Sequence, residues 1–85
     1  QFMFGGETQT IRFNYYGPSV EAVLDKFPMA KVVDKQEGVC SIEAEVFGTG
    51  VKMWLLSQGS KVKVTAPETL VQEMKQEIEK MDDWY

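Results

Sequence analysis

The chain has 85 residues, a net charge of −4 and no histidine, which limits it to one small domain with one hydrophobic core. The acidic balance argues against a domain that acts mainly on nucleic-acid phosphates, because such domains are usually basic. Without histidine the commonest general base and metal ligand is missing, and the single cysteine, Cys40, excludes an internal disulfide and a multi-cysteine zinc site.

The first seven residues read as a connection rather than as part of the domain. They contain three large apolar side chains followed by two glycines: Phe2, Met3, Phe4, Gly5 and Gly6. We interpret residues 1–7 as a connecting segment from a preceding domain. The three apolar side chains pack either on this domain's own core or against a preceding domain or a second copy, and the sequence leaves both alternatives open.

No apolar run approaches the ~18 residues of a membrane span, and no basic-then-apolar leader is present. A cytoplasmic location is therefore the default expectation.

Alternation of apolar and polar residues predicts four strands. Residues 8–15 alternate cleanly, with the apolar side chains on one face. Residues 31–35 predict a short strand, Gly38 suits the turn of a hairpin, and residues 39–47 predict the longest strand. Residues 61–65 alternate lysine with valine and predict the last strand.

Helical spacing predicts three helices between and after these strands. The first opens at Pro18, is ended by Pro28 and carries the apolar residues Val20, Val23, Leu24 and Phe27. The second runs from a possible cap at Thr49 to Gly59, which suits the left-handed position past a helix end; its apolar face is Val51, Trp54 and Leu55.

The last predicted helix is the longest, and Pro67 lies near its first position. Its apolar stripe contains Leu70, Met74, Ile78 and Met81, with Val71 beside it, and we expect this stripe to pack on the sheet. Asp82 and Asp83 oppose the helix dipole at the C-terminal end, which predicts fraying there.

The order of elements predicts an α+β fold. Strand–helix–strand–strand–helix–strand is the ferredoxin-like βαββαβ sandwich, here with an additional C-terminal helix. Right-handed crossovers place the four antiparallel strands in the spatial order 4-1-3-2. We expect this domain to span residues 8–83, with residues 84–85 as a tail.

The sheet face away from the helices is predicted to be polar. Strand one lies between a lysine-bearing and a glutamate-bearing strand, so that opposite charges can pair across strands; the residues of this face are Arg12, Asn14, Glu43, Glu45, Lys61 and Lys63. The face is either solvated and self-neutralising or a docking surface, and with Phe2, Met3 and Phe4 it is the candidate interface. RNA-recognition domains of this topology carry stacking aromatics on the middle strands, and such residues are absent at these positions.

Few residues suggest catalysis. Glu43 and Glu45 are two apart on one strand face and could act as an acid–base pair, but no pocket or partner group accompanies them in the sequence. Cys40 falls on the predicted buried face, and Trp54 is expected in the core. We assign no catalytic, cofactor-binding or metal-ligating residue.

Taken together, these segments resemble the WCX domain, the C-terminal extension of WYL-domain transcriptional regulators. The resemblance covers nearly the whole chain in order: MFGGE at 3–7, TIRF at 10–13, VEAVLDKFP at 20–28, MWLLSQGSKVKV at 53–64 and APETLVQEM at 66–74. The WLLSxG segment with the strand and proline-led helix after it is the strongest part.

The resemblance implies a longer bacterial protein with an N-terminal winged helix-turn-helix that reads DNA, a central effector-sensing WYL domain and this C-terminal domain. It implies that the C-terminal domain takes part in subunit contacts and regulation. The WYL motif itself is absent from this chain, so no ligand-binding residue is carried over. The alternatives are a free-standing small-molecule-binding module, as in amino-acid-sensing domains of similar topology, and a small ferredoxin-like enzyme.

Overall fold

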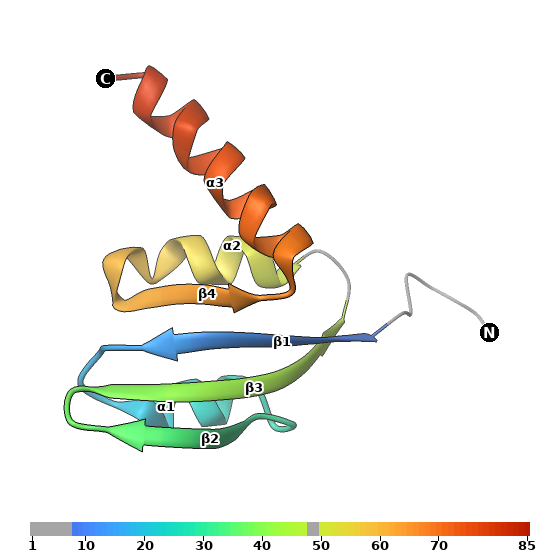
Figure 1. Cartoon of the computed structure of the whole chain (residues 1–85), viewed down its shortest axis with the longest axis vertical. Coiled ribbons are helices and arrows are strands. Elements are labelled where there is room, and N and C mark those ends of the chain that lie inside the picture. The colour runs from blue at the N-terminus through green and yellow to red at the C-terminus, as the bar shows by residue number, and fades with distance from the viewer. Residues whose placement is uncertain (1–7, 48–49) are drawn as a thin grey trace.

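The computed structural model describes residues 8–47 and 50–85, which form a four-stranded antiparallel sheet with helices packed against it (Figure 1). In chain order the elements are β1 (Thr8–Tyr15), α1 (Val20–Lys26), β2 (Lys31–Gln36), β3 (Val39–Phe47), α2 (Gly50–Ser57), the 3-10 turn η1 (Gly59–Lys61), β4 (Val62–Ala66) and α3 (Glu68–Asp83). The strand order is β2-β3-β1-β4. The predicted ferredoxin-like arrangement with a C-terminal helix is confirmed.

The two central strands build the core because their alternation directs every second side chain to the same face. Ile11, Phe13 and Tyr15 of β1 are buried. In the antiparallel register Phe13 is opposite Ile42 of β3 and Ile11 is opposite Ala44, and these partners are buried too. The core is therefore densest where β1 and β3 pair.

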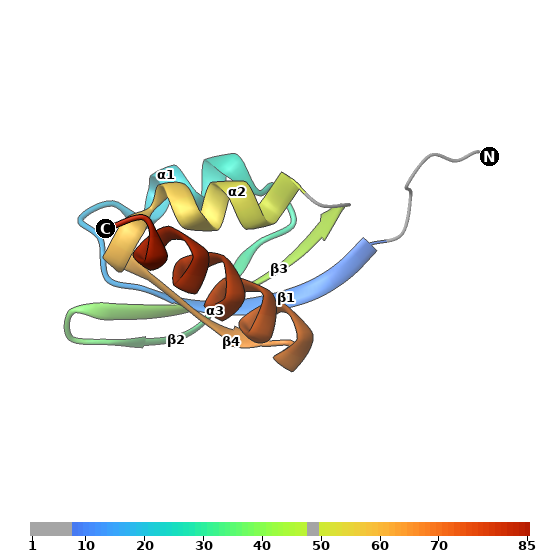
Figure 2. The ribbon, with the colours of Figure 1, turned by 90° about the horizontal axis from the view of Figure 1, so that it is seen from above.

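α1 and α2 cover this apolar face together, as Figure 2 shows from above. Val23 of α1 and Val51 and Leu55 of α2 are buried against the sheet, as the helical spacing predicts. Cys40 is partly buried and packs against the core, in agreement with its expected role as a small core residue.

Two connections between elements contain glycines in the backbone conformation that the sequence predicts. Gly38 closes the β2–β3 hairpin with φ +81°, and Gly59 follows α2 with φ +61°. Both values lie in the left-handed region that residues with a Cβ atom rarely adopt. Thr49, the expected cap of α2, lies outside the described residues.

Some element boundaries differ from the prediction. Pro18 precedes α1, whose N-cap is Ser19, whereas Pro67 is the N-cap of α3 and thus lies next to its first residue, as predicted. Lys61 ends η1, and β4 begins at Val62. α1 and β4 therefore begin one or two residues later than the residue pattern predicts.

α3 departs from the prediction in its packing. Its first half contacts β4 and α2, with Leu70 buried and Met74 packed against the core. Its second half rises away from the sheet (Figure 1), and Ile78 and Met81 remain about half exposed. The expectation that the whole stripe packs on the sheet is therefore wrong for its outer half, because none of the strands within residues 8–47 and 50–85 lies beneath it.

The end of α3 also differs from the expected fraying. The helix continues to Asp83, and the amide nitrogens of Trp84 and Tyr85 donate to the carbonyl oxygens of Met81 and Asp82 at 3.2 and 3.0 Å. Asp82 and Asp83 thus lie within the last turn despite their unfavourable interaction with the helix dipole.

Candidate docking surfaces

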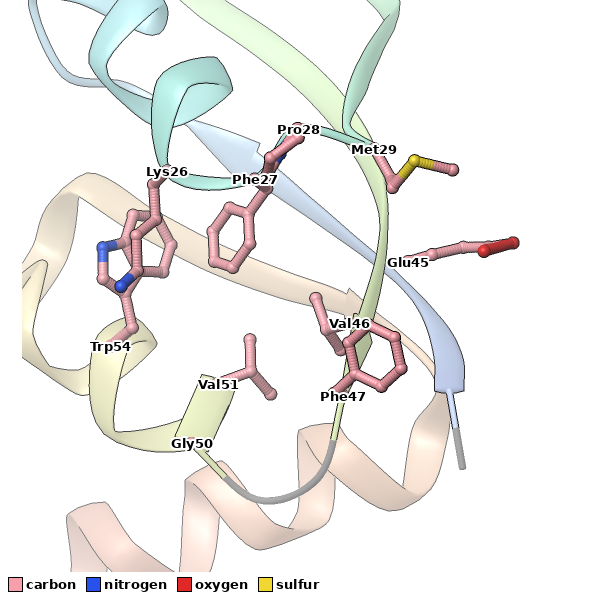
Figure 3. Close-up of a pocket in the computed structure, with 10 residues that line it drawn as sticks. All are labelled: Lys26, Phe27, Pro28, Met29, Glu45, Val46, Phe47, Gly50, Val51 and Trp54. Atoms are coloured by element: carbon pink, nitrogen blue, oxygen red, sulfur yellow. The ribbon is translucent and has the colours of Figure 1, made fainter. Parts of the chain in front are cut away.

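A cavity of about 420 Å³ opens between the end of α1, the end of β3 and the start of α2 (Figure 3). Most of its lining is apolar: Phe27, Pro28, Met29, Val46, Phe47, Val51 and Trp54. Pockets of this size accept small molecules or single large side chains. Sequence periodicity alone did not indicate it.

Aromatic rings fix the inner wall of the cavity. Trp54 of α2 meets Phe27, just past α1, edge to face at 4.8 Å between ring centroids, and meets Phe13 of β1 at 5.9 Å. Such edge-to-face pairs hold ring orientations more firmly than aliphatic contacts do. Trp54 is partly buried and packs on the core, as expected, and it also faces the cavity.

Two exposed apolar side chains lie at the cavity rim. Phe47 is 68% exposed and Met29 is 67% exposed, and both line the opening (Figure 3). The signal for them in the sequence is a large apolar residue at a position where the alternation expects a polar one. Phe47 shares its strand face with Glu43 and Glu45, and that mismatch could have indicated an apolar surface.

The charged groups of the cavity are Lys26 at the end of α1 and Glu45 of β3. Within the part of the chain that the structure describes, no three histidine, cysteine, aspartate or glutamate side chains come together as a metal site. The lining of the cavity is therefore mainly apolar, with one cationic and one anionic residue in it.

The open face of the sheet carries the predicted polar residues, and its centre is internally paired. The Arg12 guanidinium bonds to Glu43 at 2.8 Å, and Lys31 of β2 approaches the same carboxylate at 3.5 Å. The hydrogen bond from Arg12 holds the pKa of Glu43 below its ordinary value, against a smaller opposing effect of desolvation. Ser41 donates a hydrogen bond to Asn14 at 2.9 Å.

The remaining candidate residues of this face are not brought into that network. Glu45 and Lys63 are exposed, and Lys61 lies just outside β4 in η1. Among residues 8–47 and 50–85 none of these three forms an ion pair. Phe2, Met3 and Phe4 lie outside the described residues, so their predicted place in an interface stays a prediction.

A third surface lies on the outer half of α3. Ile78 is 52% exposed, Met81 49% and Trp84 83%. Lys52 of α2 reaches Glu77 of α3 at 4.0 Å, which places Glu77 on the side of the helix that faces α2. Large apolar side chains thus remain uncovered on a helix whose base is fixed to the domain.

Comparison with known proteins gives one family. The family model of the WCX domain matches residues 7–81, which is most of the chain. No curated protein matches the sequence. No helix in the described ranges is both long and apolar enough to cross a bilayer. The match runs from the residue before β1 into the last turns of α3, so it includes the sheet, the cavity and the outer half of α3: the chain belongs to the WCX domain family.

Proposed function

We propose that this chain is the C-terminal regulatory and assembly domain of a bacterial, cytoplasmic transcriptional regulator of the WYL type. WCX domains are associated with WYL-type regulators. In this proposal the partners are the regulator's own upstream WYL and helix-turn-helix domains and a second copy of the full-length protein. DNA is contacted by the full-length protein and not by this domain, and the domain has no enzymatic activity.

The observation that carries the proposal is the uncovered apolar surface on α3 and at the cavity rim. Ile78, Met81, Phe47 and Met29 are all at least 49% exposed. Large apolar side chains exposed on two separate surfaces favour docking, because contiguous exposed apolar surface usually marks an interaction site. A purely structural role would give no reason for these apolar side chains to be exposed to solvent.

Charge supports assembly rather than DNA contact. The net charge is −4, and the centre of the open sheet face pairs its cations with its own Glu43 carboxylate. Arg12 and Lys31 therefore share one carboxylate, which offsets one of their two positive charges. Phosphate binding by this face would require breaking those pairs beside exposed Glu45.

Removal of this domain from the full-length regulator tests the proposal. The truncated regulator should lose subunits in sedimentation velocity and lose its response to effector, while the isolated helix-turn-helix keeps its weak affinity for a single DNA half-site. The control is full-length protein with Glu21→Gln, a change at an exposed residue of α1 outside the three surfaces, which should behave as the parent does. An unchanged mass and an unchanged effector response after truncation would contradict the proposal.

The cavity favours a second candidate function, a small-molecule-binding module of the amino-acid-sensor type. Its volume of about 420 Å³, its apolar lining and its Lys26 side chain suit a small amino acid with an apolar side chain, whose carboxylate can pair with Lys26. In a Trp84→Phe background, Trp54 fluorescence reports on the cavity, and the twenty amino acids are the probes.

The matched control is Gly50→Leu. Gly50 lines the cavity and a Cβ atom there meets nothing within 4 Å, so a larger side chain fits at this lining position without overlapping the core. A saturable fluorescence change that disappears in Gly50→Leu supports this second function. A flat response with all twenty amino acids contradicts it and leaves assembly as the function.

A further inference from the structure

α3 and the two residues after it carry an apolar seam with the spacing of a coiled coil. Val71, Met74, Ile78, Met81 and Tyr85 follow one another at intervals of three, four, three and four residues, which is the heptad repeat. The inner end of this seam is held by the domain, while Ile78, Met81 and Tyr85 are exposed. We propose that α3 pairs with α3 of a second copy of this chain, in antiparallel orientation and with Ile78 opposite Met81. This inference rests on the assembly role proposed above and names its contact.

The register follows from the two residues that remain most central in the exposed seam. The heptad repeat has two apolar positions, a and d, and in antiparallel packing a residue at position a lies opposite a residue at position d of the partner helix. With Ile78 opposite the partner's Met81, the two-fold axis generates the same contact a second time. Met74 then lies opposite the partner's Tyr85, at the edge of the domain.

Charges on one flank of the seam are self-complementary in this register. Lys75 and Asp82 are seven residues apart and therefore occupy the same heptad position, beside the seam. Both are exposed, and neither forms an ion pair within the residues that the structure covers. Antiparallel pairing places Lys75 opposite the partner's Asp82, and symmetry repeats the pair.

The opposite orientation is disfavoured by the same residues. In a parallel pair, a residue that directly precedes a seam position lies opposite the partner residue whose number is higher by five. Glu77, which also contacts Lys52 of its own chain at 4.0 Å, would then face the partner's Asp82 on both sides, so the parallel pair brings carboxylates together where the antiparallel pair brings opposite charges together. The charge pattern thus selects the antiparallel arrangement.

The position of the domain also permits this arrangement. α3 begins next to β4 and α2, reaches α2 as far as Glu77, and then rises away from the sheet (Figure 1), so antiparallel pairing sends the two sheets to opposite ends of the helix pair. Partner Lys75 would also lie beside Asp82 in the last turn. A cation there offsets the repulsion between Asp82 and the negative end of the helix dipole.

The seam is only about two heptads long, and short interfaces give weak, transient association. We therefore expect a dissociation constant between about 1 μM and 1 mM for the isolated chain. Sedimentation velocity from about 5 μM to 1 mM covers this range. A strict monomer at the upper limit overturns the inference.

Seam and control variants test the apolar contact. Ile78→Asp should weaken association by about 100-fold, because two carboxylates replace two apolar contacts. Met53→Asp is the matched control, since Met53 is 67% exposed on α2 and lies outside the seam. Association that persists in Ile78→Asp, or that is lost equally in Met53→Asp, contradicts pairing through α3.

Charge exchange tests the register. Asp82→Lys removes one negative charge and adds one positive charge. The net charge therefore changes from −4 to −2, and the general repulsion between chains decreases. The proposed register nevertheless predicts about tenfold weaker association, because Lys75 then faces a lysine twice. The double variant Lys75→Glu with Asp82→Lys restores both the net charge and the pairing. Tighter association of Asp82→Lys, or no recovery in the double variant, overturns the register.

The same variants in the full-length regulator separate this inference from the proposed function. If removal of the whole domain leaves the assembly intact, the assembly function fails. If removal disrupts assembly while Ile78→Asp and Asp82→Lys do not, the domain assembles through another surface and only α3 pairing fails.

Discussion

Two substitutions on the apolar stripe of α3 should have very different effects on stability. Leu70 is 3% exposed and Ile78 is 52% exposed, although they lie on the same stripe. Leu70→Ala removes buried methylene groups and leaves a cavity, which costs about 2–4 kcal/mol. Ile78→Ala loses only partly buried surface and gains helix propensity, so its free energy of unfolding should change by less than about 0.5 kcal/mol.

These energies correspond to measurable shifts in melting temperature. For a domain of this length the entropy of unfolding is about 180 cal/mol/K, from roughly 2.1 cal/mol/K per residue. Leu70→Ala should therefore lower the melting temperature by about 10–20 °C, and Ile78→Ala by less than about 3 °C. The total stability expected for such a chain is about 4–13 kcal/mol, so Leu70→Met, a volume-conserving change, provides a folded control.

The assay is thermal unfolding followed by circular dichroism at a concentration of about 0.5 μM, below the expected range of dissociation constants, so that self-association has little effect on the melting temperature. Equal destabilisation by Leu70→Ala and Ile78→Ala would refute the reasoning, because the outer half of α3 would then be packed against the domain. At about 1 mM the difference should narrow, since paired α3 helices would bury Ile78.

Three further changes test other parts of the structure. Glu43→Gln should lower the melting temperature at pH 7, because the lowered pKa of Glu43 shows that Arg12 stabilises its charged form. This stabilisation is present at pH values above the ordinary pKa of 4.5 and is lost as the pH falls through the lower pKa of the folded state. The melting temperatures of parent and variant should therefore converge in acid, and a difference that persists unchanged there would contradict the pairing. Gly17→Ala should cost about 1–3 kcal/mol, because the added Cβ would overlap the buried Tyr15 ring; chemical denaturation measures it, and an unchanged midpoint would contradict that contact. Gly50→Ala should raise stability by about 0.4–1 kcal/mol, since its Cβ meets no other atom at the start of α2; a lower denaturation midpoint would contradict that prediction.

The sheet could be predicted because its burial repeats every second residue. Phe13 and Ile42 each sit in an alternating run, and their strands need no information from elsewhere to decide which side is apolar. Once the inner faces of β1 and β3 are known, the chain order and right-handed crossovers leave few arrangements. The order β2-β3-β1-β4 follows from that reasoning.

The packing of α3 could not be predicted in the same way. Helical spacing identifies Leu70, Met74, Ile78 and Met81 as one apolar stripe, but it contains no information about the length of the surface beneath. β4 has only five residues, Val62–Ala66, so the sixteen-residue helix extends past it. The cavity was missed for a related reason, since Phe27, Phe47 and Trp54 come together only when three elements meet.

The cavity and α3 share one structural element, which constrains any regulation between them. Val51 and Trp54 of α2 line the cavity, while Lys52 of the same helix reaches Glu77 of α3 at 4.0 Å. That ion pair is at the limit of contact distance and partly exposed, so by itself it transmits little energy. A ligand in the cavity can affect pairing of α3 only if it favours a different position of α2, and the edge-to-face contact of Trp54 with Phe27 is the packing that such a shift must first rearrange.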